Sequence, residues 1–239
     1  IYTNTQGFGV ADFLLGDMSS ASYNTPLVPH NFRPGHSFYA QDTWRATQKL
    51  TINYGLRYEL FAPLLNRDNQ VANFSPANGG TLITADPNAS DWYGRSLIHP
   101  DRTDFAPRFG LSYNLFNRFV VRGGYGIFYQ HANRFGSEAV MNLNPPFEIS
   151  PQLSQQQGST TPIFLLSNGF PFGALSGTSV PLSSLQIRAQ DPNQRTSYVE
   201  QASFGVQYEV SSNTIFSADY VGNFGHHMSR LRNLNQGMI

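Results

Sequence analysis

The sequence predicts an all-β fold, namely an antiparallel sheet of the kind that forms a transmembrane β-barrel. Long segments alternate between apolar and polar residues, as strands with one apolar face do. Short and long connections alternate between these segments. Only 13% of the 239 residues are charged, against roughly 25% in soluble domains, whereas 14% are aromatic. A chain of this composition suits a β-structure with much of its surface out of bulk water.

The first pair of strands is predicted around a turn at residues 45–49. In the segment KLTINYGLRYELF, residues 49–61, the even positions are apolar or aromatic and the odd positions from 51 to 59 are not. A barrel would turn the apolar face toward lipid and the polar face toward a wet lumen. The residues predicted to face lipid are Leu50, Ile52, Tyr54, Leu56, Tyr58 and Leu60. Arg57 and Glu59, on the other face, are predicted to line the lumen.

Two further strand pairs follow, with turns at 116–118 and 211–213. Their alternation places Arg108 and Arg122 on the polar face, so both are predicted to line the lumen. A weaker strand is expected around residues 19–27, because the strand near residue 40 needs a second neighbour. The chain is therefore expected to hold about seven strands.

Connection length favours the barrel over a soluble sandwich. The connections at about 62–103 and 131–196 far exceed the roughly 12–15 residues that a structureless loop in a compact soluble domain reaches. Because long and short connections alternate strictly, the long ones leave the same end of the sheet. Short periplasmic turns and long extracellular loops are typical of outer-membrane barrels.

Aromatic residues near the predicted strand ends could form the two interfacial girdles of a barrel, although a sandwich core would also contain them. These residues are Phe38, Trp44, Tyr58, Phe61, Phe119, Tyr129, Tyr208 and Tyr220.

The sequence offers no enzyme chemistry that can be argued from its motifs. His226 and His227 are adjacent on a predicted strand, so their side chains point to opposite faces and would not share a metal ion. The RGGYG segment ending at Gly126 lacks the spacing and the helix of a phosphate-binding loop, and its glycines are expected to admit a neighbouring chain closely. We therefore expect no catalytic residues, no metal, no cofactor and no nucleic-acid partner.

Several segments resemble the barrel of TonB-dependent receptors of the Oar-like type. They are ADFLLGD, SFYAQDTWRATQKLTINYGLRYELFAP, FAPRFGLSYNLFNRFVVRGGYGIFY and YVEQASFGVQYEVSSNTIFSADYVGNFGHHMSRLRNLNQ. The resemblance implies a barrel of about 22 strands in the bacterial outer membrane, with an internal plug. It also implies uptake of large or scarce substrates, driven by an inner-membrane TonB-type energy complex that acts through the plug.

The strand count departs from that family pattern. About seven strands would form only part of such a wall, so residues 1–239 are expected to be a partial barrel without a plug domain, surrounded by lipid and by the remainder of the barrel. The start at Ile1 suggests a processed product or an internal piece of a longer protein. An alternative is a cell-surface module that binds carbohydrate or partner surfaces through its long loops. A glycan-active enzyme would need convergent carboxylates that the sequence does not indicate, and the loops do not identify a substrate.

Overall fold

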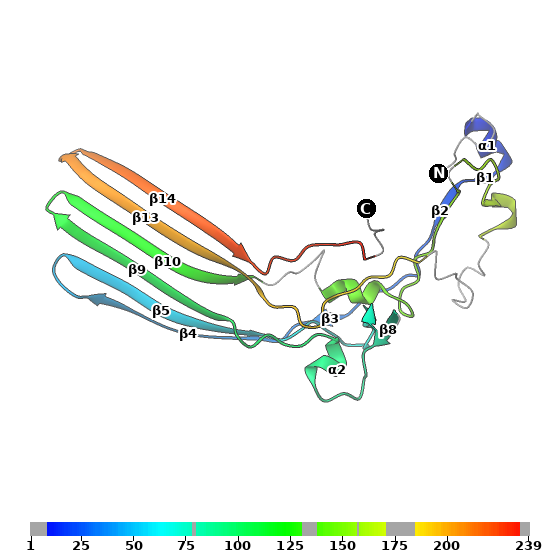
Figure 1. Cartoon of the computed structure of the whole chain (residues 1–239), viewed down its shortest axis with the longest axis horizontal. Coiled ribbons are helices and arrows are strands. Elements are labelled where there is room, and N and C mark those ends of the chain that lie inside the picture. Colours follow the sequence, from blue (N-terminus) through cyan, green and yellow to red (C-terminus); the bar gives the residue numbers. More distant parts are fainter. Residues whose placement is uncertain (1–8, 78–79, 131–137, 157, 171–184, 235–239) are drawn as a thin grey trace.

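The protein is built from one long antiparallel sheet and a layer of irregular chain at one end of that sheet (Figure 1). The computed structural model describes residues 9–77, 80–130, 138–156, 158–170 and 185–234. We use the name loop layer for the irregular layer. It consists of the described residues of four segments: 9–34, the two long connections 62–104 and 131–196, and the chain after 226.

Six strands form the sheet, in the order β14-β13-β10-β9-β5-β4. They are β4 (Gly35–Arg45), β5 (Leu50–Phe61), β9 (Phe105–Phe116), β10 (Phe119–Gln130), β13 (Ser197–Ser211) and β14 (Thr214–His226). Each strand pairs antiparallel with the next long strand in the chain. The turns 46–49, 117–118 and 212–213 lie at one end, and both long connections leave from the other (Figure 1). The predicted all-β class is confirmed, as is the alternation of short and long connections.

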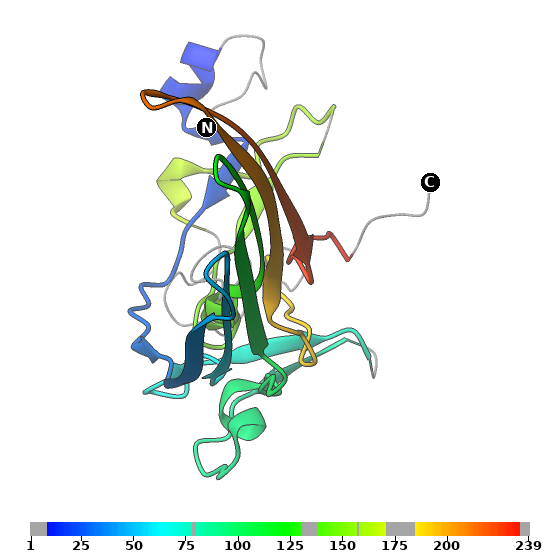
Figure 2. The ribbon, with the colours of Figure 1, turned by 90° about the vertical axis from the view of Figure 1, so that its left-hand side faces the viewer.

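The register carries the alternation of the sequence across the whole sheet. Ile52 of β5 lies opposite Leu111 of β9, which in turn lies opposite Gly123 of β10. The same row continues to Phe204 of β13 and Tyr220 of β14. Figure 2 shows the six strands side by side in a curved sheet. One face of this sheet, the apolar face, therefore collects the apolar residues of all six strands, and the opposite face, the polar face, collects the polar ones.

The strand expected around residues 19–27 does not join this sheet. The short strand β2 (Ser20–Ser22) pairs instead with β11 (Gln152–Ser154) inside the loop layer. Among the described residues β4 has β5 as its only neighbour, so the sheet has six strands rather than about seven. The segment Ser-Ala-Ser is too short and too polar to continue an apolar row, which is why the predicted pairing is wrong.

The loop layer has secondary structure of its own. Its paired strands are β1 (Asp17–Met18) with β12 (Phe164–Leu165), β3 (Asn31–Phe32) with β6 (Leu65–Asn66), and β7 (Ala72–Ser75) with β8 (Thr81–Thr84). Its helical elements are α1 (Gly9–Leu15), α2 (Trp92–Ser96), η2 (Glu138–Leu143) and η3 (Leu166–Asn168). No helix in the part of the chain that the structure describes is long and apolar enough to cross a membrane.

The hydrophobic core cluster lies in the loop layer and not against the sheet. It contains Val71, Ala85, Leu97, Ile98 and Met141, all buried. No described segment forms a second sheet on the apolar face. Many side chains of that face are therefore exposed. The sandwich alternative, which requires a second sheet packed on that face, therefore does not describe this chain.

Candidate functional site: the polar face and its junction with the loop layer

All four residues predicted to line the lumen lie on the polar face. Arg57 and Glu59 alternate on β5 with the apolar-face residue Tyr58, which lies opposite Phe105. Arg108 of β9 lies opposite Gly55 of β5 on one side and Gly126 of β10 on the other. Arg122 of β10 lies opposite Ser112 and Gly205. What this face contacts in the assembled protein stays a prediction.

Arg57 and Glu59 interact with each other rather than standing free. The guanidinium of Arg57 forms an ion pair with the Glu59 carboxylate and also donates a hydrogen bond to Ser37 Oγ (3.3 Å). The side chain of Glu59 is almost fully buried, and its backbone N–H donates to the carbonyl of Asp104 (3.0 Å). The backbone of Glu59 therefore joins the loop end of β5 to the residue that precedes β9.

Arg108 lies over an aromatic ring on the same face. Its guanidinium carbon is 4.7 Å from the centroid of the Phe128 ring, within the distance at which a cation–π interaction is effective. A side chain at Gly126 would meet the Phe128 ring at 3.0 Å and Arg108 Cγ at 3.5 Å. Because Gly126 has no side chain, Arg108 and Phe128 can come into contact. Phe128 interrupts the polar pattern of β10, and Arg108 is its partner.

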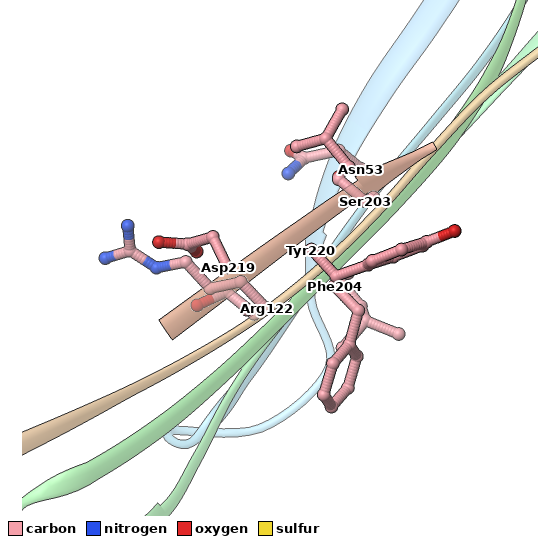
Figure 3. Close-up of a pocket in the computed structure, with 12 residues that line it drawn as sticks. Asn53, Arg122, Ser203, Phe204, Asp219 and Tyr220 are labelled. Atoms are coloured by element: carbon pink, nitrogen blue, oxygen red, sulfur yellow. The ribbon is translucent and has the colours of Figure 1, made fainter. Parts of the chain in front are cut away.

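A shallow hollow lies around Arg122, and residues from both faces of the sheet line it (Figure 3). Arg122 and Asp219 point the same way in Figure 3, whereas Phe204 and Tyr220 point to the other side of the strands. The register sets Arg122 and Asp219 on either side of Gly205, and the Asp219 carboxylate fills the space that a side chain at Gly205 would need. The hollow therefore offers one cation and one anion side by side. Asp219 was not among the predicted lumen residues, although its position on the polar face of β14 could have indicated it.

The histidine pair occupies the loop end of β14. His226 Nε2 lies 3.3 Å from Glu200 Oε1, and its ring stacks on Tyr198 with ring centroids 4.7 Å apart. His227 has a positive φ of 52°, and its carbonyl accepts a hydrogen bond from Ser197 Oγ (2.7 Å). Within the described residues there is no group of three or more His, Cys, Asp or Glu that could hold a metal ion. His226 thus packs within the sheet, while His227 ends the strand.

The two long connections meet where they enter β9 and β13. Thr196 Oγ1 donates a hydrogen bond to Asp104 Oδ2 (2.8 Å), and Thr196 N donates to Asp101 Oδ2 (3.1 Å). Arg195 Nη2 donates to Thr103 Oγ1 (2.8 Å), and its Nε lies 3.7 Å from Asp101 Oδ2. We call this contact between residues 99–104 and 192–196 the junction. Sequence analysis missed it because no local pattern links these segments.

Two carboxylates in the junction have opposite pKa shifts. Burial raises the pKa of Asp104 to about 6, against the opposing hydrogen bond from Thr196. The charges of Asp101 and Glu59 raise it further, and the charge of Arg195 lowers it. Burial also acts to raise the pKa of Asp101, but hydrogen bonds from the junction threonines and the Arg195 charge hold it below its ordinary value. Asp104 is therefore the first of the two to take up a proton.

The residues predicted to face lipid lie together on the apolar face. Side chains near the middle of this face are about half exposed, such as Leu56 (48%) and Phe109 (46%). Tyr54 OH donates to Asp42 Oδ2 (3.0 Å), which gives the one carboxylate of β4 a partner on this face.

Aromatic contacts lie near both ends of the strands. Tyr58 with Phe105 (4.7 Å) and Tyr129 with Tyr198 (5.5 Å) lie near the loop layer, and Phe119 with Tyr208 (6.4 Å) lies near the turns. Tyr220 departs from the predicted girdles, because it lies in the middle of β14 opposite Phe204. A residue in mid-strand cannot mark the boundary of an apolar band.

Comparison with protein families decides between the classes that fit this sheet. The family model described as "Outer membrane beta barrel domain" matches residues 1–239. The chain belongs to this family. Neither the comparison with curated proteins nor the one with solved structures gave a match.

The outer membrane beta barrel domain family accounts for the uncovered apolar face. Proteins of this kind lie in the outer membrane, and their walls are in contact with its lipid. Large exposed apolar surfaces on a soluble protein would be a hazard for aggregation, whereas in a bilayer they are the required surface. The localisation predicted from sequence, the bacterial outer membrane, is therefore confirmed.

Proposed function

We propose that the chain is part of the wall of a TonB-dependent outer-membrane receptor that takes up large or scarce substrates. The observation that carries this proposal is a sheet with one uncovered apolar face and one charged face, in a chain of the outer membrane beta barrel domain family. The strand motifs that resemble Oar-like receptors support the more specific assignment.

The open edges of the sheet support a wall larger than six strands. Among the described strands, β4 and β14 each have a neighbour on one side only. Unpaired backbone groups are costly in lipid, so a spanning sheet must close on itself. We propose that further strands supply the remaining wall, and that the lumen they enclose holds a plug as in the receptors that the chain resembles.

In this arrangement the polar face lines the lumen. Arg57, Glu59, Arg108 and Arg122 would then contact water, the plug or substrate. Charge of both signs beside the hollow, from Arg122 and Asp219, suits substrates with polar or zwitterionic groups. Energy for release would come from an inner-membrane TonB-type complex acting through the plug.

Binding to the energy complex tests the proposal. The full-length receptor in detergent should form a complex with the purified periplasmic domain of the host's TonB-type protein, and a porin from the same membrane should not. Absence of a complex, together with unchanged growth of cells when the TonB-type complex is deleted, would contradict the transport function and leave the outer-membrane location untouched.

The folded loop layer favours a second candidate, a cell-surface interaction module. The loop layer has its own apolar cluster and presents exposed apolar side chains on α1, among them Phe13 (57%) and Leu14 (77%). A module of this kind would bind carbohydrate or another surface without needing the energy complex. Adhesion of cells that is lost when Phe13 and Leu14 are both changed to Ser, with uptake unaffected, would favour it over the receptor.

A further inference from the structure

The junction holds together two connections that enter strands which are not neighbours. β10 lies between β9 and β13 in the sheet, so the segments entering β9 and β13 must reach across the end of β10 to touch. They do so through the side chains of Asp101, Thr103 and Asp104 on one side and of Arg195 and Thr196 on the other. A backbone hydrogen bond from His99 N to the carbonyl of Pro192 (2.8 Å) extends the contact. Opening the junction would therefore separate residues 99–104 from residues 192–196 at the mouth of the sheet.

Asp104 is the weakest point of this contact when it is ionised. Asp104 is 1% exposed. Its Oδ2 accepts a hydrogen bond from the hydroxyl of Thr196, and its buried Oδ1 has no hydrogen-bond partner among the described residues. A buried charge with an unpaired oxygen is costly. The charged and titratable groups that face Asp104 come from β5, β10 and the two connections: Glu59 with its partner Arg57, Tyr129, Asp101 and Arg195.

We propose that Asp104 is a proton-operated latch, which holds residues 99–104 of the first long connection against residues 192–196 of the second in acidic medium and releases them at neutral pH and above. When protonated, the carboxyl group is neutral, can be buried at low cost, and still accepts the Thr196 hydroxyl. When ionised, it places a third negative charge beside Asp101 and Glu59, while Arg57 is already paired with Glu59.

The direction of the effect follows from proton binding. Asp104 has a pKa of about 6 in the closed junction, whereas in an open, hydrated junction it would titrate near its ordinary value of 3.8. Between these values the closed form binds more protons than the open form, so closure weakens as pH rises through this window and is constant above it. A difference of about two pKa units would change the ratio of open to closed by up to about 100-fold.

Spin-label distances in the full-length protein, reconstituted in outer-membrane lipid, test the latch. The sequence of 239 residues contains no cysteine, so Arg102→Cys and Asn193→Cys introduce two labels in the two connections, both at exposed positions. We expect mainly the short distance at pH 4, a population of longer distances that grows as pH rises to about 6, and little further change from there to pH 8. A distance distribution that does not change with pH would overturn the proposal.

Substitutions assign the response to Asp104. Asp104→Asn keeps the shape and the acceptor for Thr196, so it should give the short distance at every pH, whereas the exposed control Asp86→Asn should keep the wild-type response. Thr196→Val should give the longer population even at pH 4. If Asp104→Asn still responds to pH, another group is responsible and the latch is wrong.

Two further measurements test the latch, one in the protein without labels and one against closure by a cation. Exchange of the His99 amide in the unsubstituted protein, corrected for the intrinsic effect of pH, should become faster as pH rises, since that N–H is bonded across the junction. Addition of Ca²⁺ at pH 8 should not restore the short distance. Restoration by Ca²⁺ and its reversal by EDTA would mean that a cation, and not a proton, closes the junction, which would also overturn the proposal.

Discussion

Asn73 binds the backbone of Gln190 with both ends of its side-chain amide. Asn73 Nδ2 donates to the carbonyl of Gln190 (2.8 Å), and Gln190 N donates to Asn73 Oδ1 (2.9 Å), over a separation of 117 residues. Asn144 binds the backbone of Arg188 in the same way. Asn144 Nδ2 donates to the carbonyl of Arg188 (2.8 Å), and Arg188 N donates to Asn144 Oδ1 (2.8 Å). Both asparagines are buried. The Asn73 amide thus replaces strand pairing and attaches Gln190 to the first long connection, whereas the Asn144 amide joins two parts of the second.

Asn73→Ala should loosen this attachment. The N–H and C=O of Gln190 would lose their partners, and a buried polar group without a partner costs about 1–3 kcal/mol. Hydrogen exchange of the Gln190 amide should therefore become faster, while exchange within β5 and β9 stays unchanged. Asn88→Ala, at an exposed position of the same connection, is the matched control. Equal protection of Gln190 in both variants would contradict the role given to Asn73.

Leu56 tests whether the apolar face contacts lipid. Leu56→Arg should lower the free energy of unfolding in lipid by about 2–4 kcal/mol, because the charge would enter the apolar band. Leu56→Phe should be nearly neutral, since lipid accommodates a larger ring, whereas a close-packed core resists overfilling by typically about 1–3 kcal/mol. Urea titrations of the protein refolded into lipid measure both variants.

Arg122→Gln is the control on the opposite face. Arg122 is exposed on the polar face, so its replacement should change stability little. Arg57 is a poorer choice, because its removal would leave the buried Glu59 carboxylate without its cation. Strong destabilisation by Leu56→Phe and Arg122→Gln together would mean that both faces are packed against protein.

The two ends of the sheet should differ in accessibility on intact cells. A cysteine at Asn88, in the first long connection, should react with a membrane-impermeant maleimide added from outside. A cysteine at Gln48, in the turn between β4 and β5, should react only after the outer membrane is permeabilised. Both positions are exposed and the chain has no native cysteine, so differences in reactivity report the side of the membrane. The reverse labelling pattern would invert the proposed topology.

Stability should depend on pH through Asp104. Its pKa is raised from 3.8 in the unfolded chain to about 6, so the folded state binds more protons between these values and loses stability as pH rises through them. The loss is at most about 3 kcal/mol, since each pKa unit corresponds to about 1.4 kcal/mol. Asp104→Asn should be more stable than the unsubstituted protein at pH 8, and similar to it at pH 4. Parallel stability curves for the two proteins would refute this assignment.

The sheet could be predicted from sequence because its information is local. Alternation of apolar and polar residues has a period of two, so Leu56 and Arg57 had to lie on opposite faces wherever the strand went. Short turns bring consecutive strands together, which fixed the three hairpins. The expected strand at residues 19–27 failed, because pairing between distant segments is not encoded by a local period.

The residues predicted to line the lumen show the same difference between what local sequence predicts and what the tertiary structure decides. The predicted lumen residues Arg57, Glu59, Arg108 and Arg122 share a face, as alternation requires. Their individual partners were not predictable: Glu59 for Arg57, the Phe128 ring for Arg108, and Asp219 beside Arg122. The last two depend on which strands are neighbours and on a glycine that leaves room between them, whereas Arg57 and Glu59 lie two positions apart on the same strand.

The sequence by itself determined the β-class, the two faces and the end from which the long connections leave, because periodicity and connection length act over a few residues. Only the tertiary structure decided how the loop layer is held together. The contact of Thr196 with Asp104 joins residues 92 positions apart, and that of Asn73 with Gln190 joins residues 117 positions apart. Burial and neighbouring charge, which raise the pKa of Asp104, exist only after these segments have met, so no pattern along the chain could have revealed them.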